Sequence, residues 1–489
     1  MKRVAIIGGG IAGLSAALCL EIWRRSGTEL EYVLFESANR LGGIIRTERT
    51  QDGFVVEAGP DSFLTEKSWM AQISRDWLGL GGQLIASNDA GRHTYILLKR
   101  ELLPLPEGLQ FFVPTRLAPV LKSPLFSAVT KARILWERFQ RPRQADADES
   151  VASLVSRHFG GAMVDRLVQP LLSGIYGGDA DGLSAQHILP RLVTLERSFG
   201  SLIRGVRNSH SGKAAQGDVE RKPLFTSFHN GMQQLVEAIA AQLPPANLRL
   251  GASVHQLSFR AAAGKWRVST EHHGGEDFDG VVLAAPVRVA AVLLENTSAE
   301  LAAELERVRS TSSIVLAFGY ERAAIAGLPP GFGFLVPRRE GKKIMACTFV
   351  HNKFSHRAPE GCGLLRAFLG GPESEAATHL SDAELLAVVR RELSEILKLR
   401  VEPLFARLFR WPHAMPQYEV GCAERMRRTQ RLLEQLPGLA LAGSAYRGIG
   451  VPDCMASGLS AAAVSAGVKA ELSRGPFPLE ATTQGVVSG

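Results

Sequence analysis

The chain has 489 residues, of which 45% are hydrophobic and 21% charged, a balance that is typical of a soluble globular protein and excludes a collagen-like or largely disordered chain. The net charge of +8 favours an acidic partner, and composition alone leaves a carboxylate substrate, an anionic lipid and a nucleic acid open. Five cysteines without a C-x-x-C pair favour a reducing compartment such as the cytoplasm, and no apolar run reaches the about 20 residues of a membrane-spanning helix.

The N-terminus predicts a strand over residues 4–7, a glycine-rich turn and a helix over residues 12–23. The turn has the pattern G-x-G-x-x-G. In this pattern Gly8 permits a tight turn, Gly10 lets a pyrophosphate approach the backbone, and Gly13 lets the helix pack closely on the strand. The N–H groups at the start of the helix would face the phosphates. We therefore predict a dinucleotide site here.

A second strand, over residues 32–35, ends at Glu36, whose carboxylate can accept hydrogen bonds from a ribose and would repel the 2′-phosphate of NADP. Arg40 and the pair Gly42-Gly43 follow, and they offer a charge and a second close backbone approach for a diphosphate. This E-x-x-x-R-x-G-G arrangement resembles the flavin-containing amine oxidase superfamily, and the resemblance implies FAD as the cofactor.

The middle of the chain changes character, because residues 102–126 are apolar and rich in proline and residues 127–139 predict a helix. The stretch 92–143 holds ten Lys or Arg residues and three Glu, so apolar and basic side chains together predict a membrane-surface patch. A helical subdomain with a solvated basic face is the alternative. Residues 205–222 are polar and predict a flexible loop, and their lack of interleaved aromatic residues argues against nucleic acid.

The remaining elements complete a nucleotide-binding domain that is interrupted twice. We predict helices over residues 231–243, 382–397 and 451–467, and strands over 248–257, 266–270, 279–285, 313–320, 343–349, 363–369 and 439–443. The predicted fold class is α/β, with a discontinuous Rossmann-type FAD-binding domain, an α+β substrate domain and a helical membrane-associated subdomain. We assign residues 1–85, 231–290 and 421–475 to the FAD-binding domain, 86–100, 191–230 and 291–420 to the substrate domain, 101–190 to the helical subdomain, and 476–489 to a tail.

Three further segments resemble the oxygen-dependent protoporphyrinogen oxidase family: SGIYGGDADGLS over 173–184, GFGFLVP over 331–337 and YRGIGVPDC over 446–454. The resemblance implies six-electron oxidation of protoporphyrinogen IX or coproporphyrinogen III in haem biosynthesis. Flavin N5 takes the hydride and O₂ reoxidises the flavin to give H₂O₂, so the protein supplies orientation and needs no catalytic side chain or metal. It also implies a homodimer, attached peripherally to the inner face of the membrane, that passes its product to ferrochelatase.

The same resemblance implies the contact residues. The cofactor contacts are Gly8, Gly10, Ile11, Ala12, Gly13, Glu36, Ser37, Arg40, Gly42, Gly43, Gly59, Pro60, Asp61, Val254, Ala284, Trp411, Gly443, Val451 and Pro452. The substrate contacts are Arg92, Thr94, Gly174, Ile175, Gly177, Phe332, Gly333, Leu335 and Phe354, of which Phe354 matches a family aromatic that sits on a pyrrole ring. Much of the family has an arginine where this chain has Thr94, so the choice between the two porphyrinogens stays open, with Arg92 as the nearby cation.

Two other functions are compatible with the sequence. One is another flavin oxidase of the superfamily that acts on amines or carotenoids, and its C-terminal signature should lack the segment 451–453. The other is a porphyrin carrier that keeps FAD only as a structural group. His93, His187 and His413 are candidate bases, but a lone histidine is more often structural, and we favour that role for each.

Overall fold

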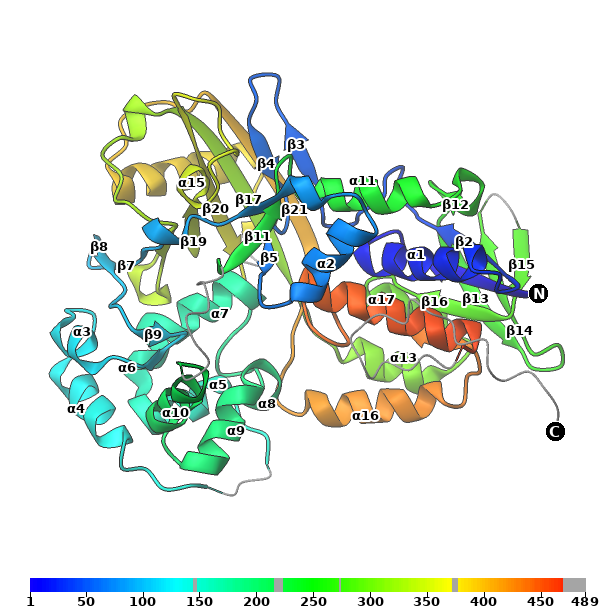
Figure 1. Cartoon of the computed structure of the whole chain (residues 1–489), viewed down its shortest axis with the longest axis horizontal. Coiled ribbons are helices and arrows are strands. Elements are labelled where there is room, and N and C mark those ends of the chain that lie inside the picture. Colours follow the sequence, from blue (N-terminus) through cyan, green and yellow to red (C-terminus); the bar gives the residue numbers. More distant parts are fainter. Residues whose placement is uncertain (144–146, 215–222, 272–273, 372–376, 469–489) are drawn as a thin grey trace.

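A computed structural model describes residues 1–143, 147–214, 223–271, 274–371 and 377–468. Figure 1 shows a long molecule with a parallel sheet and its helices at one end, and a larger mixed sheet at the other end with a group of helices beside it. None of the helices within these ranges is long and apolar enough to cross a membrane.

The parallel sheet has five strands, in the order β12 (Leu248–Arg249), β2 (Leu30–Phe35), β1 (Lys2–Ile7), β16 (Gly280–Leu283) and β22 (Leu439–Leu441). Successive side chains of β1 point to opposite faces, so that Ile6 lies in one core and Ile7 in the other. Because both faces are buried, these strands are continuous apolar runs.

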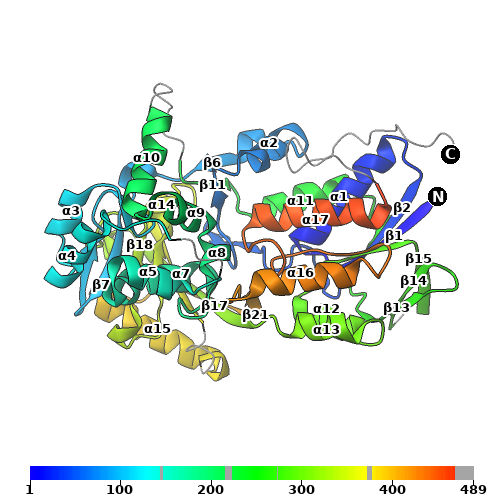
Figure 2. The ribbon, with the colours of Figure 1, turned by 90° about the horizontal axis from the view of Figure 1, so that it is seen from below.

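Helices and a small sheet enclose the parallel sheet (Figures 1 and 2). One face carries α1 (Ile11–Arg25), α11 (Gln233–Gln242) and α17 (Val451–Ala466). The other face carries β13 (Val254–Arg260), β14 (Lys265–Thr270), β15 (Gly274–Phe278), α12 (Val287–Leu294) and α13 (Ala299–Glu306). Helix α16 (Cys422–Leu433) lies beside α13 and α17, next to the edge strand β22.

Most of the predicted elements of this half are confirmed, namely the strands over 4–7, 32–35, 266–270, 279–285 and 439–443 and the helices over 12–23, 231–243 and 451–467. The single strand predicted over 248–257 is wrong. Strand β12 ends at Arg249, and Gly251, with φ at +64°, turns the chain before β13 begins at Val254. Glycine adopts this φ at no steric cost, so the chain can leave the parallel sheet here and start the antiparallel one.

The mixed sheet has seven strands, in the order β21 (Phe405–Pro416), β17 (Ser310–Glu321), β20 (Cys362–Gly370), β19 (Ala346–Phe349), β18 (Gly333–Leu335), β7 (Thr94–Leu98) and β8 (Glu101–Pro104). Strands β18 and β7 pair in parallel, whereas the other pairs are antiparallel. One face packs on α15 (Asp382–Leu397), which begins with a capping box of Ser381 and Glu384.

The structure confirms the strands predicted over 313–320 and 363–369 and the helix predicted over 382–397. The strand predicted over 343–349 begins three residues late, because the N–H groups of Lys343 and Ile344 donate to the Glu392 carboxylate instead of joining the sheet. Short strands connect the two ends of the molecule: β3 (Thr47–Arg49), β4 (Val55–Glu57), β5 (Phe63–Leu64), β6 (Leu84–Ala86) and β11 (Phe225–Phe228), with helices α2 (Ser68–Asp76) and α14 (Val350–Lys353).

The helical group has a hydrophobic core of its own. It comprises β9 (Leu109–Gln110), β10 (Val113–Pro114), α3 (Leu117–Lys122), α4 (Ala128–Glu137), α5 (Val151–Phe159), α6 (Gly161–Met163), α7 (Gln169–Tyr176), α8 (Ala185–Ile188), α9 (Pro190–Phe199) and α10 (Leu202–Ala214). Helix α4, with Ser127 as its N-cap, confirms the helix predicted over 127–139.

The flexible loop predicted over 205–222 is wrong for residues 205–214, because these residues belong to α10. The first turns of α10 bury Leu202, Ile203 and Val206 in the helical core, and this apolar start anchors the helix that the polar residues continue. Residues 215–222 lie outside the described residues. The helical core therefore extends beyond the predicted boundary at residue 190.

A buried ion network joins three helices of this group. His158 on α5 is fully buried, and its ring contacts Glu137 of α4 (Nδ1 to Oε1, 2.8 Å) and Glu196 of α9 (Nε2 to Oε1, 3.2 Å). Glu137 also accepts hydrogen bonds from Ser201 Oγ (2.7 Å) and the Leu202 N–H (2.6 Å) at the start of α10. Burial lowers the pKa of His158, but the two carboxylates outweigh it and raise this pKa above its ordinary value of 6.5.

The raised pKa of His158 predicts that the helical group loses stability in alkali. Because folding raises the pKa of His158, its ion pairs stabilise the folded state fully at pH values below the unfolded-state pKa, here 6.5. This stabilisation is lost as the pH rises through the folded-state pKa. We expect His158→Gln to lower the free energy of unfolding by about 3 kcal/mol near pH 6 and to flatten the alkaline decline. Thermal midpoints between about pH 5 and 9 measure this. His255→Gln, at an exposed position, serves as the control; an unchanged pH profile in His158→Gln would contradict the assignment.

Candidate cofactor and substrate site

The glycine turn after β1 requires glycine for two different reasons. A Cβ on Gly8, where φ is +110°, would lie 2.6 Å from the Ala284 oxygen, and one on Gly13 would lie 1.9 Å from the Gly8 oxygen. These positions need glycine for packing alone. A Cβ on Gly10 would meet no described atom within 4 Å. In the described structure no side chain caps α1, so the N–H groups of its first turn, which begins at Ile11, face this open space.

The second glycine pair lies against the first turn. The Gly42 N–H donates to the Gly9 oxygen (2.8 Å), and a Cβ on Gly43 would lie 3.3 Å from the Gly10 Cα. Arg40 donates only to backbone carbonyls of its own turn, and no carboxylate in the described ranges forms an ion pair with it. Its charge therefore stays available to an anion at this turn.

Glu36 organises the far end of the same crevice. Its carboxylate accepts from the Gly9 N–H (2.6 Å) and the Ala38 N–H (2.8 Å), and its carbonyl accepts from the Ala252 N–H (2.9 Å). The carboxylate keeps lone pairs for ribose hydroxyls. Val254 lies two residues beyond Ala252, so this predicted cofactor contact meets Glu36 and Ser37 at one end of the sheet.

Segments from the rest of the chain close the other end of the crevice. A Cβ on Gly59 would lie 2.1 Å from the Ile44 oxygen, and the Trp411 indole N–H donates to the neighbouring Ala58 oxygen (2.7 Å). The Gly443 N–H donates to Ser457 Oγ (3.1 Å), just before α17 begins with Val451 and Pro452. The open space at Gly10, the unpaired Arg40 and the start of α1 together fit the diphosphate of a dinucleotide.

A buried ion network lies directly behind the Gly59-Pro60 turn, and sequence reasoning missed its cations. Lys353 Nζ is 3.0 Å from the Asp61 carboxylate, and Arg366 is 3.5 Å from it while donating to the Gly59 oxygen (2.6 Å). Burial alone raises the pKa of Asp61, but the two cations outweigh it and hold this pKa well below its ordinary value. The network therefore fixes the predicted cofactor loop to α14 and β20. The sequence offered one signal for this cation, because Lys353 immediately precedes Phe354, a predicted substrate contact.

The predicted substrate residues gather where α7 meets the mixed sheet. The pairing of β18 with β7 sets Gly333 opposite Thr94. A Cβ on Gly174 would lie 3.7 Å from Leu335 Cδ2, which shows how closely α7 approaches β18. The next residue of α7, Ile175, is 45% exposed. Thr94, Gly174, Gly333 and Leu335 thus lie close together where α7 meets β18, with Ile175 next to Gly174 on α7. Phe332 connects to this apolar surface through a hydrogen bond from its N–H to the His93 oxygen (2.8 Å).

Gly177 connects this surface to the cofactor crevice. Its carbonyl accepts from Thr311 Oγ1 (2.9 Å), and a Cβ there would lie 3.6 Å from Met415 on β21. Trp411 lies on the same strand and donates to the cofactor loop. Strand β21 therefore joins the predicted substrate surface to the predicted flavin contacts.

Two predicted substrate residues stand apart from that surface. Arg92 is exposed on the loop before β7, 3.7 Å from Asp89. Phe354 is 1% exposed and packs between Lys353 and Arg357, so its contact with a pyrrole ring stays a prediction.

Lys67 is a further cation that sequence reasoning missed. Its Nζ lies 2.6 Å from the Asp453 carboxylate, and both side chains are about one third exposed. Asp453 lies in the first turn of α17, and its charge adds to the burial that raises the pKa of Tyr176 on α7. Lys67 is therefore held against the first turn of α17, which also carries the predicted cofactor contacts Val451 and Pro452.

The three candidate bases have structural surroundings. The His187 ring stacks on Tyr418 (ring centroids 4.1 Å apart), and burial lowers its pKa, so it is neutral. His93 contributes its carbonyl to Phe332. His413 has φ at +50° within β21, and its N–H donates to Ser312 Oγ (3.1 Å).

The parallel sheet with its glycine crevice defines a dinucleotide-binding protein. The family described as flavin containing amine oxidoreductase matches residues 11–464, and the chain belongs to that family. Coproporphyrinogen III oxidase of Bacillus subtilis (strain 168) is 34% identical over 463 residues, which cover 94% of this chain and 97% of the relative. Mitochondrial protoporphyrinogen oxidase of Nicotiana tabacum is 29% identical and covers 94% of each chain. A crystal structure from Exiguobacterium sp. 255-15 superposes with a TM-score of 0.83 at 32% identity, covering 94% and 98%.

Three glycine substitutions separate cofactor binding from folding. We expect Gly10→Ala to fold with unchanged stability and to bind FAD about tenfold to a hundredfold more weakly, because the new methyl group enters the open space beside the phosphates. Gly13→Ala should lower the free energy of unfolding of the apoprotein by about 1–3 kcal/mol, because its Cβ meets the Gly8 oxygen. Gly82→Ala, which meets no described atom within 4 Å, is the control.

Fluorescence titration with FAD and thermal melting of the apoprotein measure the two effects. Unchanged FAD affinity in Gly10→Ala would show that the diphosphate lies elsewhere.

Proposed function

We propose that this protein oxidises a porphyrinogen to the porphyrin in haem biosynthesis, with coproporphyrinogen III preferred over protoporphyrinogen IX and O₂ as the final acceptor. One observation carries this proposal: strand β21 joins the apolar surface at Gly174 and Leu335 to the cofactor loop. FAD, when bound, accepts a hydride from the macrocycle in each of three two-electron steps. The relatives named above support the same substrate class.

The protein's own contribution is orientation. Gly174 and Gly177 let the backbone of α7 approach a bulky macrocycle, while Leu335 and the half-exposed Ile175 offer apolar contact. The ion pairs of Asp61 with Lys353 and Arg366 fix the Gly59 turn. The cofactor contacts of this turn are therefore in place before substrate binds. A porphyrinogen held between these two surfaces presents a meso carbon to the crevice.

Cations around this region support the four-propionate substrate. Lys67 and Arg338 are partly exposed and contact the carboxylates of Asp453 and Asp179. Arg92, on the loop before β7, contacts that of Asp89. Substrate propionates can exchange with these carboxylates, and coproporphyrinogen III carries four propionates against two in protoporphyrinogen IX. The relative of higher identity among the two named above is also a coproporphyrinogen III oxidase.

Aerobic turnover of both porphyrinogens tests the proposal. We expect kcat/KM for coproporphyrinogen III to exceed that for protoporphyrinogen IX by about tenfold, which corresponds to about 1.4 kcal/mol and to one additional charged contact. Lys67→Met should reduce this ratio, whereas Lys122→Met, on the exposed side of α3, should leave it unchanged. Porphyrin fluorescence follows product after subtraction of non-enzymatic oxidation.

The possible results separate the parts of the proposal. Preference for protoporphyrinogen IX would reject the four-propionate assignment and leave the reaction intact. Turnover of neither substrate by FAD-loaded protein would reject the reaction, and amine turnover would favour another oxidase of the family.

We also infer peripheral membrane attachment through the outer face of α4. Val129, Trp136 and Phe139 are 70%, 63% and 71% exposed in this region. Lys131 and Arg133 lie on the same helix, and neither forms an ion pair within the described ranges. Exposed aromatic and basic side chains on and directly after one short helix suit the interface of an anionic membrane. The homodimer and the transfer to ferrochelatase stay predictions from the family resemblance.

Flotation with phosphatidylglycerol vesicles at low salt tests the membrane face. We expect the double substitution Trp136→Ser and Phe139→Ser to reduce the bound fraction by about tenfold or more, because two large apolar side chains leave the interface. Val292→Ser removes a similarly exposed apolar side chain from α12 and should have no effect. Equal flotation of all three proteins would contradict this assignment.

A further inference from the structure

Five charged side chains meet behind the Gly59 turn and form what we call the charged cluster: Glu57, Asp61, Lys353, Arg357 and Arg366. The two arginines and Glu57 are at most 1% exposed, Lys353 is 8% exposed, and the side chain of Asp61 is 16% exposed. Because water has little access to the cluster, its charges are screened less than charges at the surface.

Two cations of the cluster converge on Asp61. Lys353 Nζ lies 3.0 Å from the Asp61 carboxylate and also donates to Ser62 Oγ (3.2 Å). Arg366 Nη1 lies 3.5 Å from the same carboxylate, while its Nη2 donates to the Gly59 oxygen (2.6 Å). A single carboxylate thus serves both cations.

The third cation pairs with Glu57 and is joined to Asp61 by Ser227. Arg357 Nη1 lies 3.1 Å from the Glu57 carboxylate, and its Nη2 donates to Ser227 Oγ (2.6 Å). The Ser227 hydroxyl donates in turn to the Asp61 carbonyl oxygen (2.6 Å). The Nε atoms of Arg357 and Arg366 are buried and have no hydrogen-bond partner in the described ranges. The guanidinium groups are therefore not fully satisfied within the cluster.

Three cations against two carboxylates leave the cluster with an excess of one positive charge. The guanidinium groups stay charged at any pH at which the protein is folded. Burial lowers the pKa of Lys353 below its ordinary value of 10.5, and the Asp61 carboxylate favours the charged ammonium. Burial raises the pKa of Glu57, so a proton gained there would enlarge the excess.

The cluster adjoins the predicted cofactor crevice. Arg366 binds the Gly59 oxygen, and a Cβ on Gly59 would lie 2.1 Å from the Ile44 oxygen. Ile44 follows Gly43, and a Cβ on Gly43 would lie 3.3 Å from the Gly10 Cα. Close backbone contacts thus connect the cluster with the glycine turn that would hold the diphosphate.

The cluster also contacts the aromatic side chain that is predicted to bind the substrate. The centre of the Phe354 ring lies 5.2 Å from Lys353 Nζ and 5.6 Å from Arg357 Cζ. The excess charge therefore adjoins predicted contacts of both the cofactor and the substrate.

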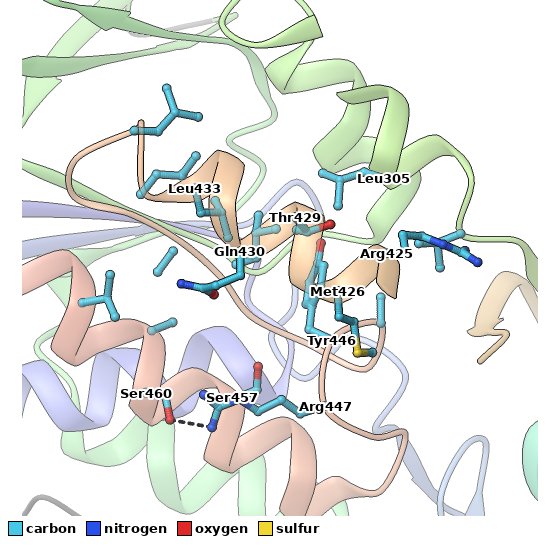
Figure 3. A pocket seen from close by; sticks show the side chains of 18 of the residues that line it. Leu305, Arg425, Met426, Thr429, Gln430, Leu433, Tyr446, Arg447, Ser457 and Ser460 are labelled. Atoms are coloured by element: carbon cyan, nitrogen blue, oxygen red, sulfur yellow. Dashed lines mark hydrogen bonds between the residues drawn. The ribbon is translucent and has the colours of Figure 1, made fainter. Parts of the chain in front are cut away.

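The arginines at the cavity between α16 and α17 do not converge in this way. Figure 3 shows Arg425 and Arg447 on opposite sides of this cavity, which has a volume of about 400 Å³. Arg425 donates to the Arg307 oxygen (2.9 Å) and Arg447 to Ser460 Oγ (2.9 Å). Their charges therefore do not combine, unlike those of the charged cluster.

We propose that the excess positive charge of the cluster favours the reduced form of the bound FAD, and that Lys353 supplies this excess. A hydride brings two electrons and one proton to a neutral flavin ring, so the ring gains one negative charge, which a buried positive charge nearby stabilises. The inference rests on the FAD-dependent reaction proposed above and on the predicted contact of the Gly59 turn with the flavin. It does not depend on which porphyrinogen is oxidised.

Anaerobic titration of the FAD-loaded protein against a reference redox dye measures the equilibrium constant for reduction of the flavin. We expect Lys353→Met to lower this constant about tenfold, or about 30 mV for two electrons, because a unit charge roughly 10 Å away has an effect of this size at an effective dielectric constant of about 20. Lys353→Arg keeps the charge and should restore the parent value.

Ser62→Asp is a second test that leaves every buried partner in place. The Ser62 hydroxyl contacts Lys353, so the new carboxylate cancels the excess charge beside the same cation. We expect the same decrease of about tenfold. Ser62→Asn has a similar size without the charge, and as the matched control it should leave the constant unchanged.

An unchanged constant in FAD-loaded Lys353→Met and Ser62→Asp would overturn the proposal. Equal decreases in Ser62→Asp and Ser62→Asn would also overturn it, because they would show an effect of packing and not of charge. If Lys353→Met does not fold, the comparison of the two Ser62 variants decides. No porphyrinogen is present in these titrations, so their failure is distinct from a failure of the proposed reaction.

Discussion

The close contact of α1 with α17 is the constraint on which the site depends. A Cβ on Gly458 would lie 2.0 Å from the Ala12 oxygen, and one on Gly13 would lie 1.9 Å from the Gly8 oxygen. Helix α1 is therefore pressed between β1 and a helix from the opposite end of the chain. Because these contacts are made by backbone, they leave no freedom in the relative position of the helices. The N-terminal glycine turn and the segment that begins at Val451 then flank one crevice.

The second constraint is electrostatic and acts between the two sheets. Lys353 and Arg366 are buried against Asp61, whose side chain is 16% exposed, and removing any one of the three would leave a charge without its partner in a largely desolvated place. Such a network adds little net stability, but it allows only one arrangement of the Gly59 turn relative to β20. A flavin ring and a macrocycle must meet with their reacting atoms in fixed positions, so rigidity at this junction is useful to the chemistry.

The sequence predicted what depends on local pattern. Apolar runs located β1, β2 and β16, and the spacing of Gly8, Gly10 and Gly13 located the crevice. It failed where a distant residue decides the structure. Residues 205–214 are polar, yet they continue a helix that is anchored by Leu202 and by Glu137 of α4. The pairs of Asp61 with Lys353 and of Lys67 with Asp453 join segments that no spacing rule connects.

Net charge is a poor guide to function in this chain, whereas ion pairing is a better one. Most arginines of α16 have carboxylate partners and need no other explanation. Among the described cations without such partners, Arg40 lies at the glycine turn, and Lys131 and Arg133 lie on α4. Each place adjoins an apolar surface or a backbone cradle, where an anion is held away from bulk water and the attraction is stronger.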